Sequence, residues 1–60
     1  MISIRKNPNM TRWFQVFSFG RLVDEFDKKS RAIRLAESLA KEVDQEAINV
    51  EGLLIKVRER

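Results

Sequence analysis

A run of aromatic side chains between Arg12 and Phe19 is the feature that most constrains how this chain can fold. Aromatic and β-branched residues at this density favour a half-buried β-strand. Successive side chains of a strand point to opposite faces, so one face carries Phe14, Val16 and Ser18, and the other carries Trp13, Gln15, Phe17 and Phe19. Both faces contain apolar side chains, and each of them needs a cover.

The segments on either side of the aromatic run predict a hairpin and an N-terminal arm. Gly20 interrupts the run, and a second strand-like segment continues to Phe26, so residues 12–26 predict a β-hairpin that turns near Gly20. Asn7-Pro8-Asn9 is a turn signal, because proline fixes φ and asparagine tolerates turn geometry. Residues 1–10 are therefore expected to form an arm whose first six residues can make a short strand.

Residues 28–43 have the periodicity of an amphipathic helix. The positions on its apolar side are Ala32, Ile33, Leu35, Ala36, Leu39, Ala40 and Val43. Asp27 precedes the segment and is expected to be the N-cap, because an aspartate side chain can accept from the free amides of the first turn. The basic cluster at the beginning of the helix, Lys28-Lys29-Ser30-Arg31 with Arg34, is interpreted as a solvated surface.

The segment 47–60 is strand-like, and Leu53, Ile55 and Val57 alternate with Lys56 and Arg58. This period of two predicts a strand with one covered face. Glu51-Gly52 is compatible with a hairpin turn or with a bulge. The order β-β-α-β, with or without one extra short strand, predicts a single α+β domain over residues 1–60, in which an antiparallel sheet carries one amphipathic helix on one face.

The residue types leave little for catalysis. The 60 residues include no cysteine and no histidine, so disulfides, imidazole bases and the commonest zinc ligands are absent. Asp24 and Glu25 would point to opposite faces of a strand, and the two glycines form no phosphate-binding loop. We therefore expect no enzyme, no cofactor and no metal site.

Hydropathy and charge predict a cytoplasmic protein with an electropositive first third. No apolar run follows the basic start as a secretory signal requires, and none approaches the roughly 18 residues of a membrane span. The 12 Lys and Arg exceed the nine Asp and Glu by three, and the first 23 residues hold four of these bases and no acid. The aromatic run is thus flanked by positive charge.

One helix can cover only one face of the aromatic strand, and three covers for the other face compete. The arm could fold across it with Ile2 and Ile4. A second copy could pack sheet against sheet or extend the sheet edge. A ligand could also cover it, either a host protein or a single-stranded nucleic acid whose phosphates lie near the basic residues Arg12, Arg21, Lys56, Arg58 and Arg60.

The favoured interpretation is a small non-enzymatic protein-interaction module that forms a homodimer through the aromatic strand. Its expected anchors are Trp13, Phe17 and Phe19, with Arg12 and Arg21 as flanking polar contacts. A nucleic-acid-binding module that uses the same face is the alternative and is not favoured.

Residues 31–41, RAIRLAESLAK, resemble the helix of the small bacterial domain-of-unknown-function family 2188. Phe14-Gln15-Val16 is similar to the first strand of that family, except that phenylalanine replaces tryptophan. The resemblance implies a ββαβ-type fold without an established activity. Through the genomes in which small members of the family occur, it also implies a phage or prophage accessory protein.

Overall fold

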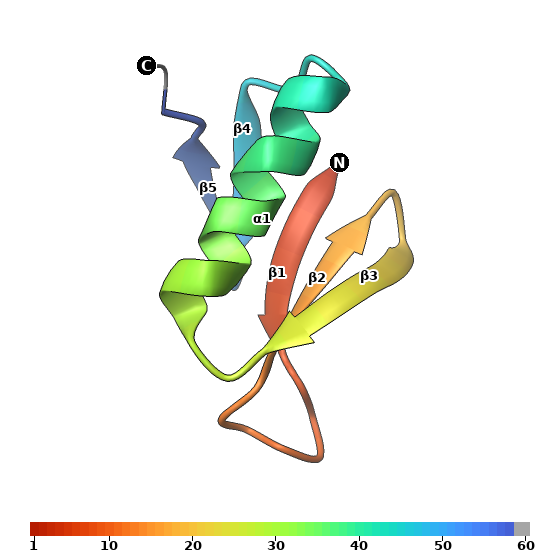
Figure 1. Ribbon diagram of the computed structural model, residues 1–60, viewed down its shortest axis with the longest axis vertical. Helices are drawn as coiled ribbons and strands as arrows, with labels where there is room; N and C mark the ends of the chain where they lie inside the picture. The colour runs from red at the N-terminus through yellow and green to blue at the C-terminus, as the bar shows by residue number, and fades with distance from the viewer. Residues whose placement is uncertain (59–60) are drawn as a thin grey trace.

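The computed structural model describes residues 1–58 and shows an α+β fold, in which one helix lies on one face of a five-stranded sheet (Figure 1). The elements in chain order are β1 (Ile2–Lys6), β2 (Phe14–Ser18), β3 (Arg21–Phe26), α1 (Lys29–Glu42), β4 (Ala47–Val50) and β5 (Leu53–Lys56). The strands lie in the order β3-β2-β1-β4-β5. The predicted class, a small sheet with one helix, is confirmed.

The N-terminal segment is the central strand of the sheet and not an arm. Ile2 and Ile4 of β1 are buried, at 0% and 1% exposure, on the face that α1 covers. β1 pairs with β2 in the antiparallel sense and with β4 in the parallel sense, so the sheet is mixed and not antiparallel throughout. The parallel pair arises because α1 carries the chain back across the sheet before β4 begins.

Two tight turns of the same type join the outer strands to their neighbours. Phe19-Gly20 connects β2 to β3, and Glu51-Gly52 connects β4 to β5. All four residues have positive φ, from 51° to 90°, as the two central residues of a type I′ turn require. Glu51-Gly52 is therefore a hairpin turn, which decides between the two alternatives that the sequence left open.

The expected N-cap at Asp27 is wrong. The N-cap is Lys28, its side chain makes no capping hydrogen bond, and the first turn of α1 contains no acid. The helix begins one residue later than expected, because the first carbonyl oxygen that accepts from the helix is that of Lys28, which accepts from the amides of Arg31 and Ala32. At the other end Asp44, with φ of 58°, completes a Schellman motif in which the Gln45 amide donates to the Ala40 carbonyl oxygen.

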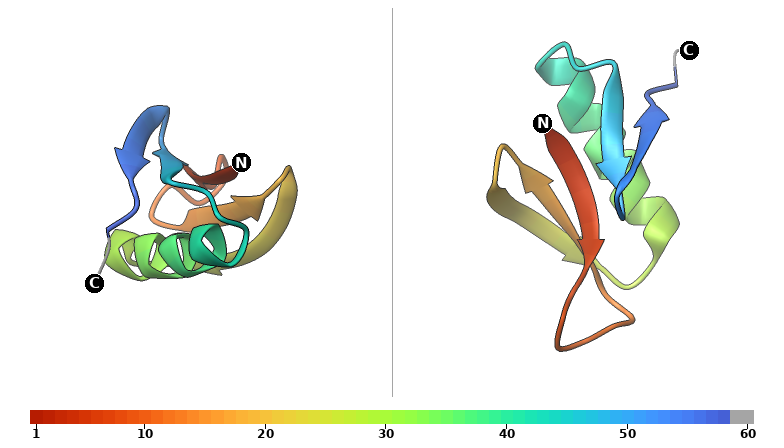
Figure 2. Two further views of the ribbon diagram at one scale, coloured as in Figure 1. Left: turned by 90° about the horizontal axis from the view of Figure 1, so that it is seen from above. Right: turned by 180° about the vertical axis from the view of Figure 1, so that it is seen from behind.

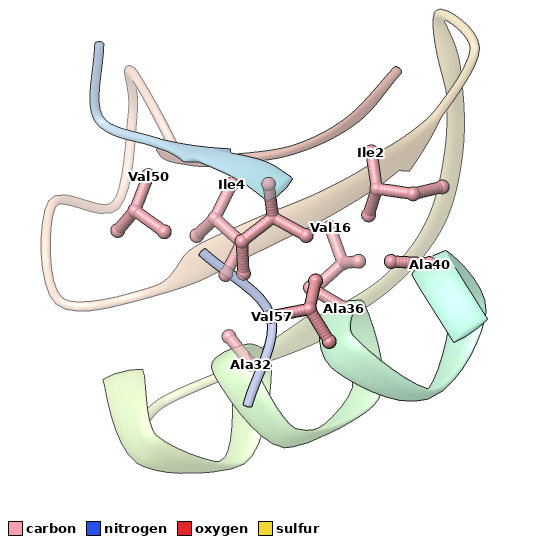
Figure 3. Packing of buried hydrophobic residues seen from close by; sticks show 9 residues of the cluster. Ile2, Ile4, Val16, Ala32, Ala36, Ala40, Val50 and Val57 are labelled. Carbon is pink, nitrogen blue, oxygen red and sulfur yellow. The ribbon is translucent and has the colours of Figure 1, made fainter. Parts of the chain in front are cut away.

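The core is small and lies between α1 and the middle of the sheet (Figure 3). Ala32, Ala36 and Ala40 recur every four residues on α1 and expose none of their surface. Their short side chains let the helix approach the sheet closely. The buried side chains of the strands and of the C-terminal segment are Ile2, Ile4, Val16, Ile48, Val50 and Val57. Within residues 1–58, no helix is long and apolar enough to cross a membrane.

Candidate functional site

The sheet face opposite α1, which we call the open face, is not covered by any element of residues 1–58. Figure 2 (right) looks onto this face with the helix behind the sheet. Strand register and alternation from the buried positions place the following residues on it: Ser3, Arg5, Gln15, Phe17, Leu22, Glu25, Ala47, Asn49, Leu54 and Lys56. In β1, β2 and β4 the buried residues face the helix. Because successive side chains of a strand point to opposite faces, the residues that alternate with them lie on the open face.

Phe17 lies near the middle of the open face with a cation on its ring. The Arg5 guanidinium carbon is 4.3 Å from the centroid of the Phe17 ring, a cation–π contact between neighbouring strands. On the other side Leu22 pairs with Phe17 in register and is 53% exposed. The centre of the face is therefore a partly buried ring between an arginine and an exposed leucine.

One polar atom beside this centre lacks a partner. Gln15 lies in register between Arg5 and Glu25, and its side-chain oxygen is buried without a hydrogen-bond donor in the described part of the chain. A buried acceptor without a donor is costly.

The loop that follows β1 is fixed to β3 through Asn7. The Asn7 side-chain amide nitrogen donates to the Glu25 carboxylate at 2.6 Å, and the Asn7 side-chain oxygen accepts from the amides of Asn9 and Met10. The predicted turn at Asn7-Pro8-Asn9 is thus present and ordered by an Asx arrangement. The Asn7 amide is neutral, so this contact gives Glu25 a hydrogen bond but no ion pair. The charged residues of the open face are the cations Arg5 and Lys56 and the carboxylate of Glu25, none of them in an ion pair among residues 1–58.

The structure distributes the predicted interaction residues over the length of β2 and does not gather them. Phe17 is on the open face, whereas Trp13 precedes the strand and is 36% exposed, and Phe19 is at the hairpin tip and 61% exposed. Arg12 and Arg21 are exposed near opposite ends of the strand. Because β2 lies between β1 and β3, it cannot extend a sheet edge, and it can meet a second copy only through its face.

The N-terminal arm is excluded as the cover of this face, because Ile2 and Ile4 point to the other side of the sheet. Of the three covers considered from the sequence, a second copy and a ligand therefore remain. Arg60, which was grouped with the basic residues of the nucleic-acid alternative, lies outside the described residues.

The expectation of a covered face on the last strand is wrong for β5 itself. Leu53, Leu54 and Ile55 are 69%, 66% and 41% exposed, and only Val57, which follows the strand, is buried. The helix packs against β1, β2, β3 and β4 but does not contact β5. Figure 2 (left) shows the β4–β5 hairpin rising away from the helix. β5 is therefore an edge strand with apolar side chains on both faces.

Both ends of β5 are held in place. Before the strand, the Gly52 amide donates to the side-chain oxygen of Asn49 at 2.8 Å. After the strand, the Val57 amide donates to the Glu46 carbonyl oxygen at 2.8 Å. Two nitrogens of the Arg58 guanidinium donate to the two oxygens of Glu37 on α1, at 3.1 and 3.2 Å, and these hydrogen bonds lower the pKa of the Glu37 carboxyl.

The remaining polar features include an ion pair at the start of α1 and a hollow beside this helix. The Lys29 ammonium lies 3.0 Å from the Glu51 carboxylate, and this hydrogen bond lowers the pKa of Glu51. A hollow of about 450 Å³ lies beside α1, lined by Phe26, Arg31, Arg34, Leu35 and Ser38. Within the described residues, no cluster of three or more acidic side chains could hold a metal ion.

Comparisons with known proteins add no further assignment. No family model, no curated protein and no solved structure matches the chain. The resemblance of residues 31–41 to family 2188 stays a prediction.

Sequence reasoning missed three residues that define the surface: Arg5, Leu22 and Leu54. Arg5 was assigned to an arm, and its position over Phe17 depends on the central place of β1 in the sheet. Leu22 could have been found from the two-residue turn, which fixes its register opposite Phe17. For Leu54 the signal was present, because Leu53-Leu54-Ile55 contains no polar position and thus cannot give a strand one wet face.

Proposed function

We propose that the protein is a small non-enzymatic protein-interaction module that acts in the cytoplasm as a homodimer and binds a partner protein through its open face. The observation that carries the proposal is the uncovered centre of this face, where Phe17 and Leu22 lie beside Arg5. Exposed apolar side chains that gather on one surface of a small domain mark binding sites. The core of nine side chains, three of them alanine, also favours a chain that gains stability by association.

Charge and polarity indicate the chemistry of the partner. Cations outnumber anions on the open face, since Arg5 and Lys56 stand against the single carboxylate of Glu25, which accepts a hydrogen bond from Asn7. A complementary surface therefore carries carboxylates around an apolar centre that covers Phe17. We infer an acidic protein surface as the ligand.

The experiment places a photo-crosslinking amino acid, p-benzoylphenylalanine, at Leu22 in the organism that encodes the protein. The matched control places it at Ser38, which is exposed on α1 on the other side of the molecule. We expect an adduct with an acidic protein from Leu22 and none from Ser38. Equal adducts from both positions, or none from Leu22, would contradict the proposal.

The crosslinked protein is then purified and its binding measured directly. We expect Arg5→Glu to weaken the affinity at least about ten-fold and the affinity of the unaltered chain to fall with salt. Arg34→Glu, which makes the same charge change on α1, is expected to leave the affinity within about two-fold of the unaltered value. Equal losses from both variants would indicate non-specific attraction to net charge, and not docking on the open face.

Single-stranded nucleic acid is a second candidate because a ring, a guanidinium and two side-chain amides lie together on the open face. Phe17 and Arg5 could stack on a base, and Gln15 and Asn49 could bond its edge. The test is fluorescence anisotropy with a labelled oligonucleotide at roughly 50 mM salt. Binding that Phe17→Ala removes would favour this candidate, and the absence of binding would exclude it.

A further inference from the structure

We propose that the homodimer forms by antiparallel pairing of β5 with β5 of a second copy, around a two-fold axis at Ile55. This inference rests on the homodimer of the proposed function and assigns its interface to the sheet edge. It leaves the open face free for the partner protein.

The two edges of the sheet differ in protection against pairing. β3 carries Asp24 and Glu25, and its register shifts opposite Val16 and Phe17. Charged residues and bulges are the usual devices that keep an edge strand from adding another strand. β5 has neither a bulge nor an acid, and Lys56 at its end is its one charged residue. The unprotected edge is therefore β5.

The backbone of β5 offers a symmetric set of hydrogen-bonding groups. The Glu51-Gly52 turn closes on the Val50–Leu53 pair, and bonded and non-bonded pairs alternate from there. The N–H and C=O groups of Leu54 and Lys56 consequently point away from β4. They lie symmetrically about Ile55, so a two-fold axis at Ile55 pairs Leu54 of each copy with Lys56 of the other and satisfies all of them.

The side chains suit this register. On the helix side Ile55 meets Ile55 of the second copy, and on the open face the Lys56 stem lies over Leu54 of the second copy. No two like charges stand opposite each other, because each Lys56 faces Leu54 of the second copy and Lys56 is the one charged residue of β5. The pairing covers three apolar side chains per copy that are now 41% to 69% exposed. The strand is already fixed at both ends, so little order is lost on pairing.

The axis of such an antiparallel pair is perpendicular to the sheet, so each face of the sheet continues into the same face of the second copy. Both helices then lie on one side of a continuous ten-stranded sheet, and both open faces lie on the other. The dimer presents the partner protein with two copies of the Phe17 centre on one surface.

The test compares Leu54→Lys with Leu22→Lys by sedimentation equilibrium over a range of concentrations. Both positions are exposed on the open face, in β5 and in β3 respectively. The unaltered chain is expected to approach twice its mass of 7.1 kDa as concentration rises. Leu54→Lys places like charges opposite Lys56 of the second copy and is expected to weaken dimerisation about ten-fold or more. Leu22→Lys is expected to dimerise normally.

A double substitution tests the register. Leu54→Lys with Lys56→Glu sets opposite charges across the interface in the proposed pairing and is expected to restore the dimer to within about three-fold of the unaltered chain. Circular dichroism verifies that each variant is folded. Hydrogen exchange gives a second readout, because the amides of Leu54 and Lys56 are expected to gain protection as the concentration rises.

The outcomes separate this inference from the proposed function. A dimer that survives Leu54→Lys and is lost in Leu22→Lys would overturn the edge pairing and leave a homodimer that packs through its open faces. A dimer lost in Leu54→Lys without rescue by the double substitution would overturn the register. A chain that stays monomeric at the highest concentration would overturn both the edge pairing and the homodimer, whereas the crosslinking from Leu22 judges the open face independently.

Discussion

The close approach of α1 to the sheet depends on Ala36, and enlarging this side chain is the most direct test of the fold. Ala36 lies in the middle of the alanine stripe and exposes none of its surface. A leucine there adds three carbon atoms where neighbouring atoms are already in contact. Either the helix rises from the sheet or the leucine adopts a strained rotamer, and overpacking of this kind costs about 1–3 kcal/mol.

This cost is large for a chain of 60 residues. At about 0.05–0.15 kcal/mol per residue, its stability is about 3–9 kcal/mol. For a domain of this size each kilocalorie moves the melting temperature by about 4–8 °C, so Ala36→Leu is expected to lower it by about 4–24 °C. Urea unfolding followed by helix circular dichroism and by the fluorescence of Trp13 measures the loss at a fixed protein concentration, because association also stabilises the fold.

Ser38→Leu is the matched control, because Ser38 is exposed on the same helix and leucine forms helices at least as well as serine. We expect its stability to stay within about 0.5 kcal/mol of the unaltered chain. If Ala36→Leu proved as stable as Ser38→Leu, the alanine stripe would not be the buried side of α1. The helix would then be rotated toward Leu35 and Leu39, and the account of the core would be refuted.

Three further predictions concern the Arg58–Glu37 ion pair after β5, the turn between β2 and β3, and the N-terminal strand β1. Arg58→Gln is expected to lower stability at pH 7, because the lowered pKa of Glu37 means that its pairing with Arg58 stabilises the fold above the ordinary pKa of 4.5. The difference should shrink as the pH falls through the lowered pKa of Glu37, and a difference that stays the same throughout an acid titration would contradict this. Phe19→Asn is expected to raise the free energy of unfolding by about 0.5–1 kcal/mol, because asparagine tolerates the positive φ of this position. Gly20→Ala, at φ of 85°, is expected to lower it by about 1 kcal/mol. Thermal unfolding measures both, and the opposite order of the two variants would refute the turn assignment. Deletion of residues 1–6 removes the central strand and is expected to abolish the cooperative unfolding transition seen by circular dichroism, and a folded truncated chain would show that the segment is an arm after all.

The local elements could be predicted from the sequence because each carries its own periodicity. The aromatic run is dense in aromatic and β-branched residues and ends at a glycine with positive φ, which suffices for the β2–β3 hairpin. The apolar positions of α1 recur with the helical period. The N-cap was missed because Asp27 has the right chemistry but lies one residue before the position at which the helix begins. Side-chain chemistry alone therefore does not fix the boundary of the element.

The order of the strands could not be predicted in the same way. Ile2 and Ile4 have the alternation of a half-buried strand, yet nothing within residues 1–6 indicates that this strand lies between β2 and β4. That position depends on pairings with residues 14–18 and 47–50, which are distant in the sequence. The strand order determines which residues share the open face. The contact of Arg5 with the Phe17 ring therefore could not be predicted from sequence patterns within either strand.

The exposed surfaces of this fold have a common geometric origin. A helix is about 10–12 Å wide, whereas five strands spaced by about 4.8 Å place the outermost strands about 19 Å apart. One helix therefore cannot cover all five strands of one face: α1 packs against β1, β2, β3 and β4 but not β5, and lies over the middle of the sheet, where Ile2, Ile4 and Val16 are buried. The opposite face and the outer strands must be polar or find a cover elsewhere. At β3 the chain meets this requirement in part, with Asp24 and Glu25, although Leu22 and Val23 are exposed. At β5 no acidic residue meets it. The proposals for the open face and for β5 thus have the same physical cause, which is apolar surface that one helix leaves uncovered. A partner protein covers it on the open face, and a second copy of the chain covers it at β5.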